Sequence, residues 1–416
     1  MPESFSGKPS GHGPLLYGPV GETEREAAAC LARLGFGHSS DFFNRTCAVF
    51  GWDVLRGLRR GNWLVGVAAS WTMQQWFGGR PIRAQAVAMV TIDPANRAQG
   101  LGGTLMSGLL EEARSDGCAV SILYPATMPL YSKAGYGRAG VSLNWSAPPT
   151  ALAMGRGFDV QGTIERISGD DAGPLAAVRQ QLLATENGLI ERGEGLWLFS
   201  LSTPAGEPAE VFLLGGPGGT EGYIALSPPG DRRLVVTDLC LPTRRSARLA
   251  INLLAGFRAQ VDEVQWHGGP DDPLALLAGD SGARITGREE WLLRIVDVEA
   301  ALSHRGYGSN LSGCLTLNVT DPLLPSNSGR FRLTVWQGRA QVDRLSRSDG
   351  LLEEDSPDWS SSGDITLSVS TLASLYTGHA GAVRLRQIGL LSGDDASVAT
   401  AAALFGGCAP WMPDRF

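Results

Sequence analysis

The sequence predicts an α/β fold that occurs twice in succession and is followed by a smaller α+β domain. Residues 1–147 contain, in order, a helix, antiparallel strands, a second helix and another strand, which is typical of a mixed twisted sheet flanked by helices. A similar order of elements returns in residues 148–297, whereas residues 298–416 hold several strand-like runs and one closing helix. A chain of 416 residues is too long to fold around a single hydrophobic core. We therefore expect three domains with these boundaries.

The first region provides the elements of one layered unit. Glu22–Leu34 is the first expected helix. Asn62–Ile92 is expected to form three strands, with the stretch FGGRP as one tight turn. Leu101–Ala113 follows as an amphipathic helix and Cys118–Tyr124 as the next strand.

The second region resembles the first around one of its helices. Beyond a linker at Ser146–Gly157, the run RLVVTDLCL precedes a helix as AVAMVTID does in the first region. The two helices superpose without a gap when Pro242 is placed on Pro94, which indicates a duplicated unit. The other coinciding positions are Arg245 on Arg97, Leu249 on Leu101, Leu253 on Leu105 and Gly256 on Gly108.

The two copies differ at the start of this helix. Gly100 of the first copy becomes Arg248 in the second, and Gly102 becomes Ala250. The second copy therefore keeps the packing residues and loses the glycines. If the glycines serve a ligand, we expect only the first copy to bind it.

The third region begins near Val298. A short helix in VDVEAALSHRGY is followed by the strand-like runs GCLTLNV, GRFRLTVW and DITLSVSTLASLY. Ala396–Gly406 is the last expected helix. This order predicts a small α+β domain.

Composition and charge favour a cytoplasmic protein without nucleic-acid or metal partners. The net charge is −7, whereas nucleic-acid binding requires a basic surface. The six cysteines form no CxxC pair and the five histidines no HExxH spacing, so we expect reduced thiols and no metal. The N-terminus lacks the apolar core of a signal peptide, and no apolar run approaches the about 20 residues of a membrane span.

The turn before the second helix has the composition of an anion site. The first N–H groups of a helix have no partner inside it, and the helix dipole makes this end positive. Glycine at Gly100, Gly102 and Gly103 would let an anion reach those N–H groups, and Arg97 adds a fixed positive charge. A pyrophosphate is the anion that suits this construction. The alternative is a tight turn with no ligand.

Other phosphate-binding motifs fit less well. A Rossmann fingerprint would need a third glycine where Leu105 stands, and the GK[ST] of a P-loop is absent. The pattern R-x-x-G-x-G between a strand and a helix resembles the acyl-CoA signature of the GCN5-related N-acetyltransferases (GNAT superfamily). The segment MPLYSKAGYG, Met128–Gly137, resembles the second motif of that superfamily. The resemblance implies an acetyl-CoA site formed by Val90, Thr91, Ile92, Arg97, Ala98, Gln99, Gly100, Leu101, Gly102 and Gly103.

The whole architecture narrows the resemblance. Two acetyltransferase-like units, the second degenerate, followed by WLLRIVDVEAALSHRGY and a small α+β domain, resemble the Eis (enhanced intracellular survival) family. The last domain of that family resembles sterol carrier proteins. The resemblance implies acetyl-CoA-dependent acetylation of amines, with aminoglycosides and lysine side chains as substrate types, and assembly as a homo-oligomer, a hexamer.

The resemblance also implies two catalytic groups. Tyr131 is the expected general acid, which protonates the departing thiolate, and the chain-terminal carboxylate on Phe416 is the expected base. A backbone N–H at Val90 or its neighbours is expected to stabilise the oxyanion. An α-carboxylate of pKa about 3.5 is a weak base unless its surroundings raise that value or a water relays the proton.

Four residues are expected to contact the acceptor amine. Aromatic residues of the first region would wall the acceptor pocket, with Phe36 and Trp52 as our choices from a set that also holds Phe42, Phe43, Trp71 and Trp76. Asp41 and Asp414 could receive a cationic amine. Arg415 departs from this picture, because an aminoglycoside site requires acidic groups. A smaller or less charged amine is the alternative, and a non-catalytic lipid-binding or interaction protein is the alternative function.

Overall fold

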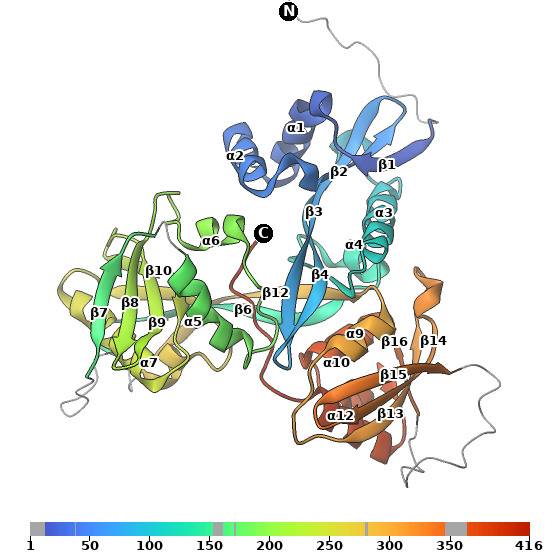
Figure 1. The fold of residues 1–416 in the computed structure, drawn as a ribbon. Helices are drawn as coiled ribbons and strands as arrows, with labels where there is room; N and C mark the ends of the chain where they lie inside the picture. Colours follow the sequence, from blue (N-terminus) through green and yellow to red (C-terminus); the bar gives the residue numbers. More distant parts are fainter. Residues whose placement is uncertain (1–12, 38, 153–160, 170–171, 279–281, 346–363) are drawn as a thin grey trace, which may run out of the picture.

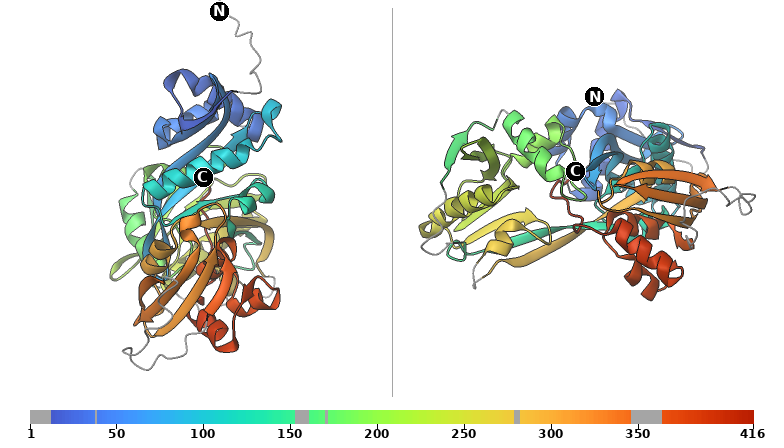
Figure 2. Two further views of the ribbon diagram at one scale, coloured as in Figure 1. Left: turned by 90° about the vertical axis from the view of Figure 1, so that its right-hand side faces the viewer. Right: turned by 60° about the horizontal axis from the view of Figure 1, so that its bottom comes forward.

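The computed structural model describes residues 13–37, 39–152, 161–169, 172–278, 282–345 and 364–416. The chain forms three lobes that meet at a central junction (Figures 1 and 2). The predicted α/β and α+β architecture is confirmed. Part of the predicted linker and the run SPDWSSSGD lie outside the described residues. No helix among the described residues is long and apolar enough to cross a membrane.

The first lobe contains strands of the large sheet and the helices that cover it. Residues Asn62–Ile92, expected to form three strands, form only two. No glycine, proline, asparagine or aspartate lies between Val67 and Phe77, so nothing reverses the chain there. The elements are β1 (Leu15–Pro19), η1 (Glu22–Glu24), α1 (Arg25–Phe36), α2 (Ser40–Phe50), η2 (Trp52–Val54), β2 (Leu55–Arg60), β3 (Trp63–Phe77), β4 (Arg80–Ile92), η3 (Pro94–Asn96), α3 (Leu101–Ser115), β5 (Val120–Leu123), α4 (Met128–Lys133) and β6 (Gly137–Ala147).

The second lobe repeats the strand–helix–strand unit of the first. In the first lobe β4 and β5 are parallel, and in the second lobe β10 and β11 are parallel, each pair being joined by one helix. The elements are β7 (Thr163–Ile167), α5 (Gly173–Leu183), α6 (Glu194–Ser200), β8 (Glu210–Gly216), β9 (Gly219–Leu226), β10 (Arg233–Cys240), α7 (Arg244–Ala255), η4 (Gly256–Ala259), β11 (Glu263–Gly268), α8 (Pro273–Leu277) and β12 (Arg284–Ile295).

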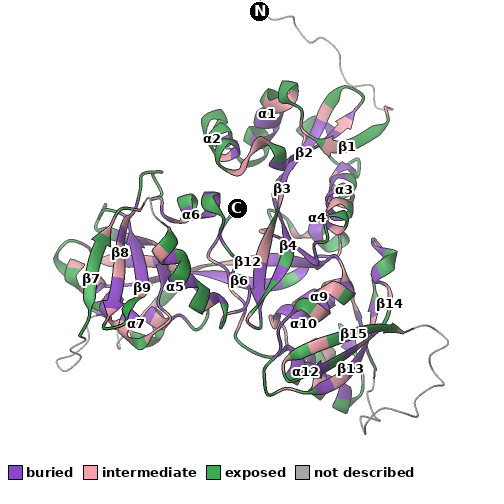
Figure 3. Ribbon diagram, in the orientation of Figure 1, coloured by how far each residue is buried: buried purple, intermediate pink, exposed green. Residues whose placement is uncertain are grey.

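The first two lobes share one twelve-stranded sheet. Its order is β1-β2-β3-β4-β5-β12-β6-β11-β10-β9-β8-β7, so β12 lies between β5 and β6. The strand that ends the second region thus completes the first unit, and β6 pairs with β11 of the second. Buried residues are concentrated on β6 and the end of β12, where the lobes meet (Figure 3). Strands on both sides of the sequence boundary near residue 147 therefore belong to one sheet.

The third lobe is a five-stranded sheet with helices, and its core continues into the large sheet. One cluster of buried apolar side chains includes Phe77 of β3, Trp291 of β12 and Leu317 of β13. The predicted closing helix is confirmed. The elements are α9 (Val298–His304), β13 (Gly313–Thr320), η5 (Pro325–Asn327), β14 (Gly329–Trp336), β15 (Arg339–Leu345), β16 (Asp364–Ser368), α10 (Val369–Thr377), α11 (Ala382–Gln387), β17 (Leu391–Ser392) and α12 (Asp395–Phe405).

The C-terminal segment leaves the third lobe and runs back between the other two, where it ends near α6 and β3 (Figure 1). Val141 of β6 holds this segment on both sides: its N–H donates to Pro410 O (3.2 Å), and its carbonyl accepts from the Met412 N–H (3.1 Å). The Tyr124 hydroxyl donates to Met412 O at 2.7 Å. The last residues are therefore fixed against the large sheet.

Candidate active site

The glycine turn leaves the start of α3 open. Ala98 and Gly100 both have positive φ, 62° and 77°, so the turn reverses sharply before the helix begins. Gly100 is the N-cap and offers no side chain to the helix. Among the described residues, the backbone N–H groups of Gly100, Leu101 and Gly102 have no hydrogen-bond partner. These donors can bind an anion.

The three glycines have different surroundings. A Cβ added at Gly100 or Gly103 would meet no atom within 4 Å. A Cβ at Gly102 would lie 3.1 Å from Leu130 Cδ1, so this glycine also lets α4 approach α3. The space beside Gly100 and Gly103 is therefore open to a ligand.

The second copy has closed the equivalent site. Helix α7 starts at Arg244, five residues before Leu249, which superposes on the first residue of α3. Thr243 caps it, because its hydroxyl accepts a hydrogen bond from the Ser246 N–H at 3.1 Å. Leu249 stays buried, as the sequence comparison predicts. The start of the helix is thus left open in the first copy, whereas Thr243 and Ser246 cap it in the second.

Other predicted residues of the cradle have structural partners. The Arg97 Nε donates to the Ile92 carbonyl at 3.3 Å, which bends this side chain back over the turn. The Gln99 Oε1 accepts from Arg60 Nη1 at 2.8 Å. Thr91 is buried. Arg97 contributes positive charge near the cradle, and Gln99 is held by Arg60.

We expect Gly103→Asp to raise the KM for acetyl-CoA on the order of ten- to a hundredfold, because a carboxylate would stand beside the pyrophosphate. The fold should tolerate the change, since the added side chain enters open space and an acidic residue in the first helical turn is favourable. Initial rates and the thermal midpoint would be measured, with Gly103→Ala as the control. An unchanged KM would mean that the cradle holds no phosphate.

Strand β4 diverges from β5 just before the cradle. The parallel pairing stops at Ala86, which faces Ile122, and Met89 has a positive φ of 53° within a bulge against β3. Beyond this point β4 has an edge that β5 does not cover. Val90 lies on this segment and lines a cavity.

The cavity between the lobes has a volume of about 310 Å³. Four predicted residues line it together: Phe36, Val90, Tyr131 and Phe416. The residues that we expect to supply the acid, the base and the oxyanion donor thus line one cavity. The remaining wall residues are Phe42, Thr46, Cys47, Phe50, Val54, Ala69, Trp71, Val87, Ala88, Met89, Tyr124, Ala126, Phe199 and Arg415.

Aromatic rings form a continuous row along this wall. Phe50 contacts Phe199 and Trp71, with ring centroids 5.6 and 5.0 Å apart. The Phe416 ring lies 5.5 Å from Trp71 and 6.1 Å from Tyr124, in edge-on geometry. Phe199 comes from α6 of the second lobe, so the wall needs both lobes.

Tyr131 lies on α4 with its side chain buried. Its exposed fraction is 4%, and its ring stands edge-on to Tyr136 at 6.0 Å. Its hydroxyl has no hydrogen-bond partner among the described residues. Burial raises the pKa of Tyr131 to about 12. The phenol is therefore protonated at neutral pH, as a general acid must be.

Three predicted substrate residues do not line the cavity. Asp41 is exposed on α2, and Trp52 packs on Phe43 with the Arg25 guanidinium 4.4 Å from its ring. Asp414 is buried and bound by two arginines, so it cannot receive a substrate amine. The structure gives these residues packing or positioning roles. Of the other aromatic candidates, Phe42 and Trp71 line the cavity, whereas Phe43 and Trp76 belong to the core.

The buried carboxylate of Asp414 belongs to a network that anchors the C-terminal segment. Arg179 Nη2 lies 2.8 Å from its Oδ2, and Arg192 Nε lies 2.5 Å from its Oδ1. Arg192 also pairs with Asp238, which accepts from the Tyr223 hydroxyl at 2.7 Å. The second lobe thus holds the residue that stands two positions before Phe416.

Family models and relatives agree with this architecture. Acetyltransferase (GNAT) domains match residues 17–139 and 188–295, and a sterol carrier protein domain matches residues 298–413. An uncharacterized N-acetyltransferase of Streptomyces avermitilis is 30% identical over 82% of both chains. One of Streptomyces griseus is 30% identical over 82% of this chain and 83% of its own.

Solved structures share the fold over almost the whole chain. A GCN5-related N-acetyltransferase from Anabaena variabilis has a TM-score of 0.88 and 27% identity, covering 97% of this chain and 100% of its own. Eis1 of Mycobacterium abscessus has a TM-score of 0.77 and 24% identity, with the same coverage, a likeness of fold alone. The protein is an acyltransferase with two GNAT domains and a sterol-carrier-like domain. It belongs to the N-acetyltransferase family of its Streptomyces relatives.

Proposed function

We propose that this acetyltransferase transfers the acetyl group of acetyl-CoA to a single amine carried on an apolar or aromatic small molecule. The composition of the cavity wall is the observation that carries this proposal. Among the described wall residues, the charged groups are the Arg415 guanidinium, which lies 2.8 Å from Glu289, and the chain-terminal carboxylate of Phe416. The rest of the wall is mainly aromatic and aliphatic.

A polycationic acceptor suits this wall poorly. Each ammonium group that enters an apolar site without a carboxylate loses its hydration, which costs several kcal/mol. A ring or alkyl chain gains about 25 cal/mol for each Å² of apolar surface that it buries. Aminoglycosides, which the Eis resemblance implies, therefore rank below a small aryl or alkyl amine, and a lysine side chain lies between them.

The described residues can support the chemistry of direct attack on the thioester. An apolar wall disfavours the ammonium form and so lowers the pKa of a bound amine. We propose that the carboxylate of Phe416 accepts the proton that the amine nitrogen loses when it attacks the thioester carbonyl. The Val90 N–H stabilises the oxyanion, and Tyr131 protonates the leaving thiolate. Acetyl-CoA supplies the activated acetyl group.

A ternary complex is favoured over an acetylated enzyme. Cys47 is the thiol of the cavity wall, and burial raises its pKa to about 11. A neutral buried thiol is a poor nucleophile. Incubation with acetyl-CoA alone should therefore leave the intact mass of the protein unchanged, and a stable acetyl adduct on Cys47 would contradict direct transfer.

The experiment that tests the substrate class is CoA release with five amines: an arylalkylamine, a straight-chain alkylamine, a polyamine, a lysine peptide and an aminoglycoside. We expect the arylalkylamine to have the highest kcat/KM, at least about tenfold above the aminoglycoside, because about 1.4 kcal/mol of ring burial corresponds to this factor. If the aminoglycoside were the best substrate, the apolar cavity would not be the acceptor site.

We further propose, on the resemblance to the Eis family alone, that the protein is a member of that family, assembles as a hexamer and works in the cytoplasm. Large apolar side chains lie exposed on the second and third lobes and could support subunit contacts. Leu276 is 70% exposed and Trp336 is 60% exposed.

A further inference from the structure

The third lobe contributes a residue to the wall beside the cradle. A second cavity, of about 330 Å³, is lined by Gly100, Gly103 and Lys133, and also by Leu323. Leu323 lies on the loop between β13 and β14, in the region that matches a sterol carrier protein. Its side chain packs, half-buried, against the core of the first lobe.

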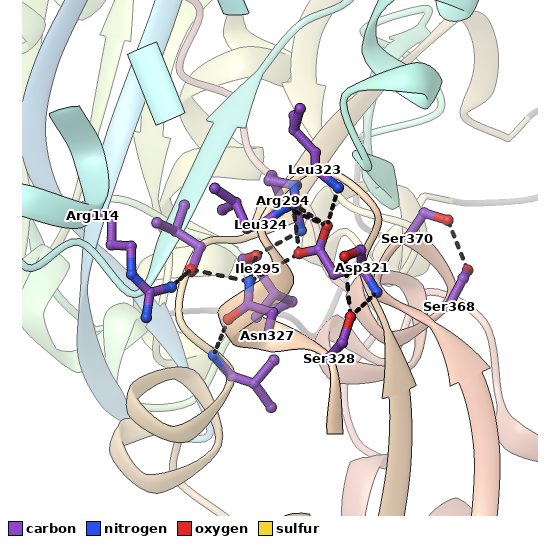
Figure 4. A network of polar contacts seen from close by, with 12 residues as sticks. Arg114, Arg294, Ile295, Asp321, Leu323, Leu324, Asn327, Ser328, Ser368 and Ser370 are labelled. Atoms are coloured by element: carbon purple, nitrogen blue, oxygen red, sulfur yellow. Dashed lines mark hydrogen bonds and ion pairs between the residues drawn. The ribbon is translucent and has the colours of Figure 1, made fainter. Parts of the chain in front are cut away.

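A buried ion pair holds this loop in place. Arg294 Nη2 lies 2.8 and 2.6 Å from the two carboxylate oxygens of Asp321, and neither side chain is exposed. Asp321 Oδ1 also accepts the backbone N–H groups of Leu323 and Leu324, at 3.1 Å each. Figure 4 shows Leu323 at the edge of this network, with its side chain directed away from the polar contacts.

A second contact locks the loop onto the large sheet. Asn327 Nδ2 donates to Asp321 Oδ2 at 3.0 Å and to the carbonyls of Ile295 and Val296, while its Oδ1 accepts from the Val298 N–H (Figure 4). Three of these hydrogen bonds join the loop to the segment Ile295–Val298, where β12 ends and α9 begins, and the fourth lies within the loop. The loop is fixed relative to the first lobe.

The same arginine lies behind the second acetyltransferase motif. Gly135 has a φ of 84°, and a Cβ there would lie 2.9 Å from Arg294 Nε. Desolvation makes a buried ion pair weak evidence for stability, whereas such pairs can define one arrangement of the chain. Arg294 is therefore placed to set the distance between α4 and the Leu323 loop.

We propose that the loop carrying Leu323 is part of the acetyl-CoA site and that Leu323 packs against the adenosine end of the ligand. The thioester end must reach Tyr131 in the first cavity, and the pyrophosphate fits the open N–H groups of α3. The second cavity shares no wall residue with the first and begins at the cradle glycines, so we assign it to the adenosine that follows the pyrophosphate. Leu323 supplies an apolar surface for the base, and Lys133 a positive charge for its phosphate.

This inference rests on the use of acetyl-CoA and not on the proposed amine, so its test needs no acceptor. Calorimetric titration of the full chain with acetyl-CoA, adenosine 3′,5′-bisphosphate and S-acetylpantetheine separates the two ends of the ligand. We expect Leu323→Ala to weaken the first two ligands by the same factor, about three- to tenfold. S-acetylpantetheine, which lacks the adenosine, should bind as it does to the wild type.

Two further variants complete the design. Asp321→Asn weakens the ion pair that holds the loop. It should likewise weaken acetyl-CoA and adenosine 3′,5′-bisphosphate and leave S-acetylpantetheine unchanged, so a folding defect of one variant alone does not decide the result. Leu390→Ala, on an exposed leucine of the third lobe, is the matched control and should bind all three ligands normally. Unchanged binding of adenosine 3′,5′-bisphosphate to both loop variants, or equal weakening of S-acetylpantetheine, would overturn the proposal.

Discussion

Tyr131→Phe is expected to lower kcat by about 10²- to 10³-fold while the KM for acetyl-CoA stays within about twofold. The hydroxyl is lost, but the ring keeps its packing against Tyr136. CoA release with the best amine of the panel would measure both constants. Tyr136→Phe is the matched control, since the Tyr136 hydroxyl lies 2.7 Å from Ser121 Oγ and outside the cavity wall. That variant should lose about 1 kcal/mol of stability and keep its kcat.

The pH dependence of kcat gives a second test of the same role. A general acid must be protonated, and burial raises the pKa of Tyr131 to about 12, above the ordinary value of about 10. Ionisation of the acid should therefore cause no loss of kcat below about pH 11. Such a weak acid releases its proton only as negative charge develops on sulfur, so proton transfer must accompany C–S cleavage. Full activity of Tyr131→Phe would remove the tyrosine from the mechanism.

Local motifs account for the part of the candidate site that could be predicted from the sequence. The cradle, from Arg97 to Gly103, and the segment around Tyr131 are short strings whose backbone geometry depends on their own glycines. The difference between the two copies could also be predicted, because Arg248 and Ala250 replace glycines where a ligand would need them. Each of these predictions needs only neighbours in the chain.

Long-range contacts account for what the sequence could not predict. Phe199 and Leu323 reach their cavities from other lobes, and no local pattern marks them. Strand β12 of the second region enters the sheet of the first unit by pairing with β6, which lies more than a hundred residues earlier in the chain. Asp414 was expected to bind substrate because its carboxylate could receive a cationic amine. Its partners Arg179 and Arg192 lie 235 and 222 positions away, and only the fold brings them together.

Asp414→Asn is expected to release the C-terminal segment and to lower kcat on the order of a hundredfold. The change leaves Arg179 and Arg192 buried with one carboxylate fewer, and an uncompensated buried charge costs about 3–5 kcal/mol. Detachment of the segment lets water reach both guanidinium groups. It removes the unfavourable buried charge at a lower free-energy cost than global unfolding, because it is a local opening. The row of rings around Phe416 would then be broken, and the proposed base would leave the cavity.

Carboxypeptidase digestion measures this detachment without reference to catalysis. Phe416 should be released slowly from the wild type and rapidly from Asp414→Asn, while the thermal midpoint falls by less than a global loss of 3–5 kcal/mol would require. The double variant Arg179→Met/Asp414→Asn restores charge balance within the network. It should recover part of both the protection and the activity, because the two sites are in contact and their effects are not additive. If Asp414→Asn kept Phe416 protected and kcat intact, the second lobe would not position the terminus. The second lobe, whose helix lacks the glycine cradle, would then have no role in the reaction through this contact.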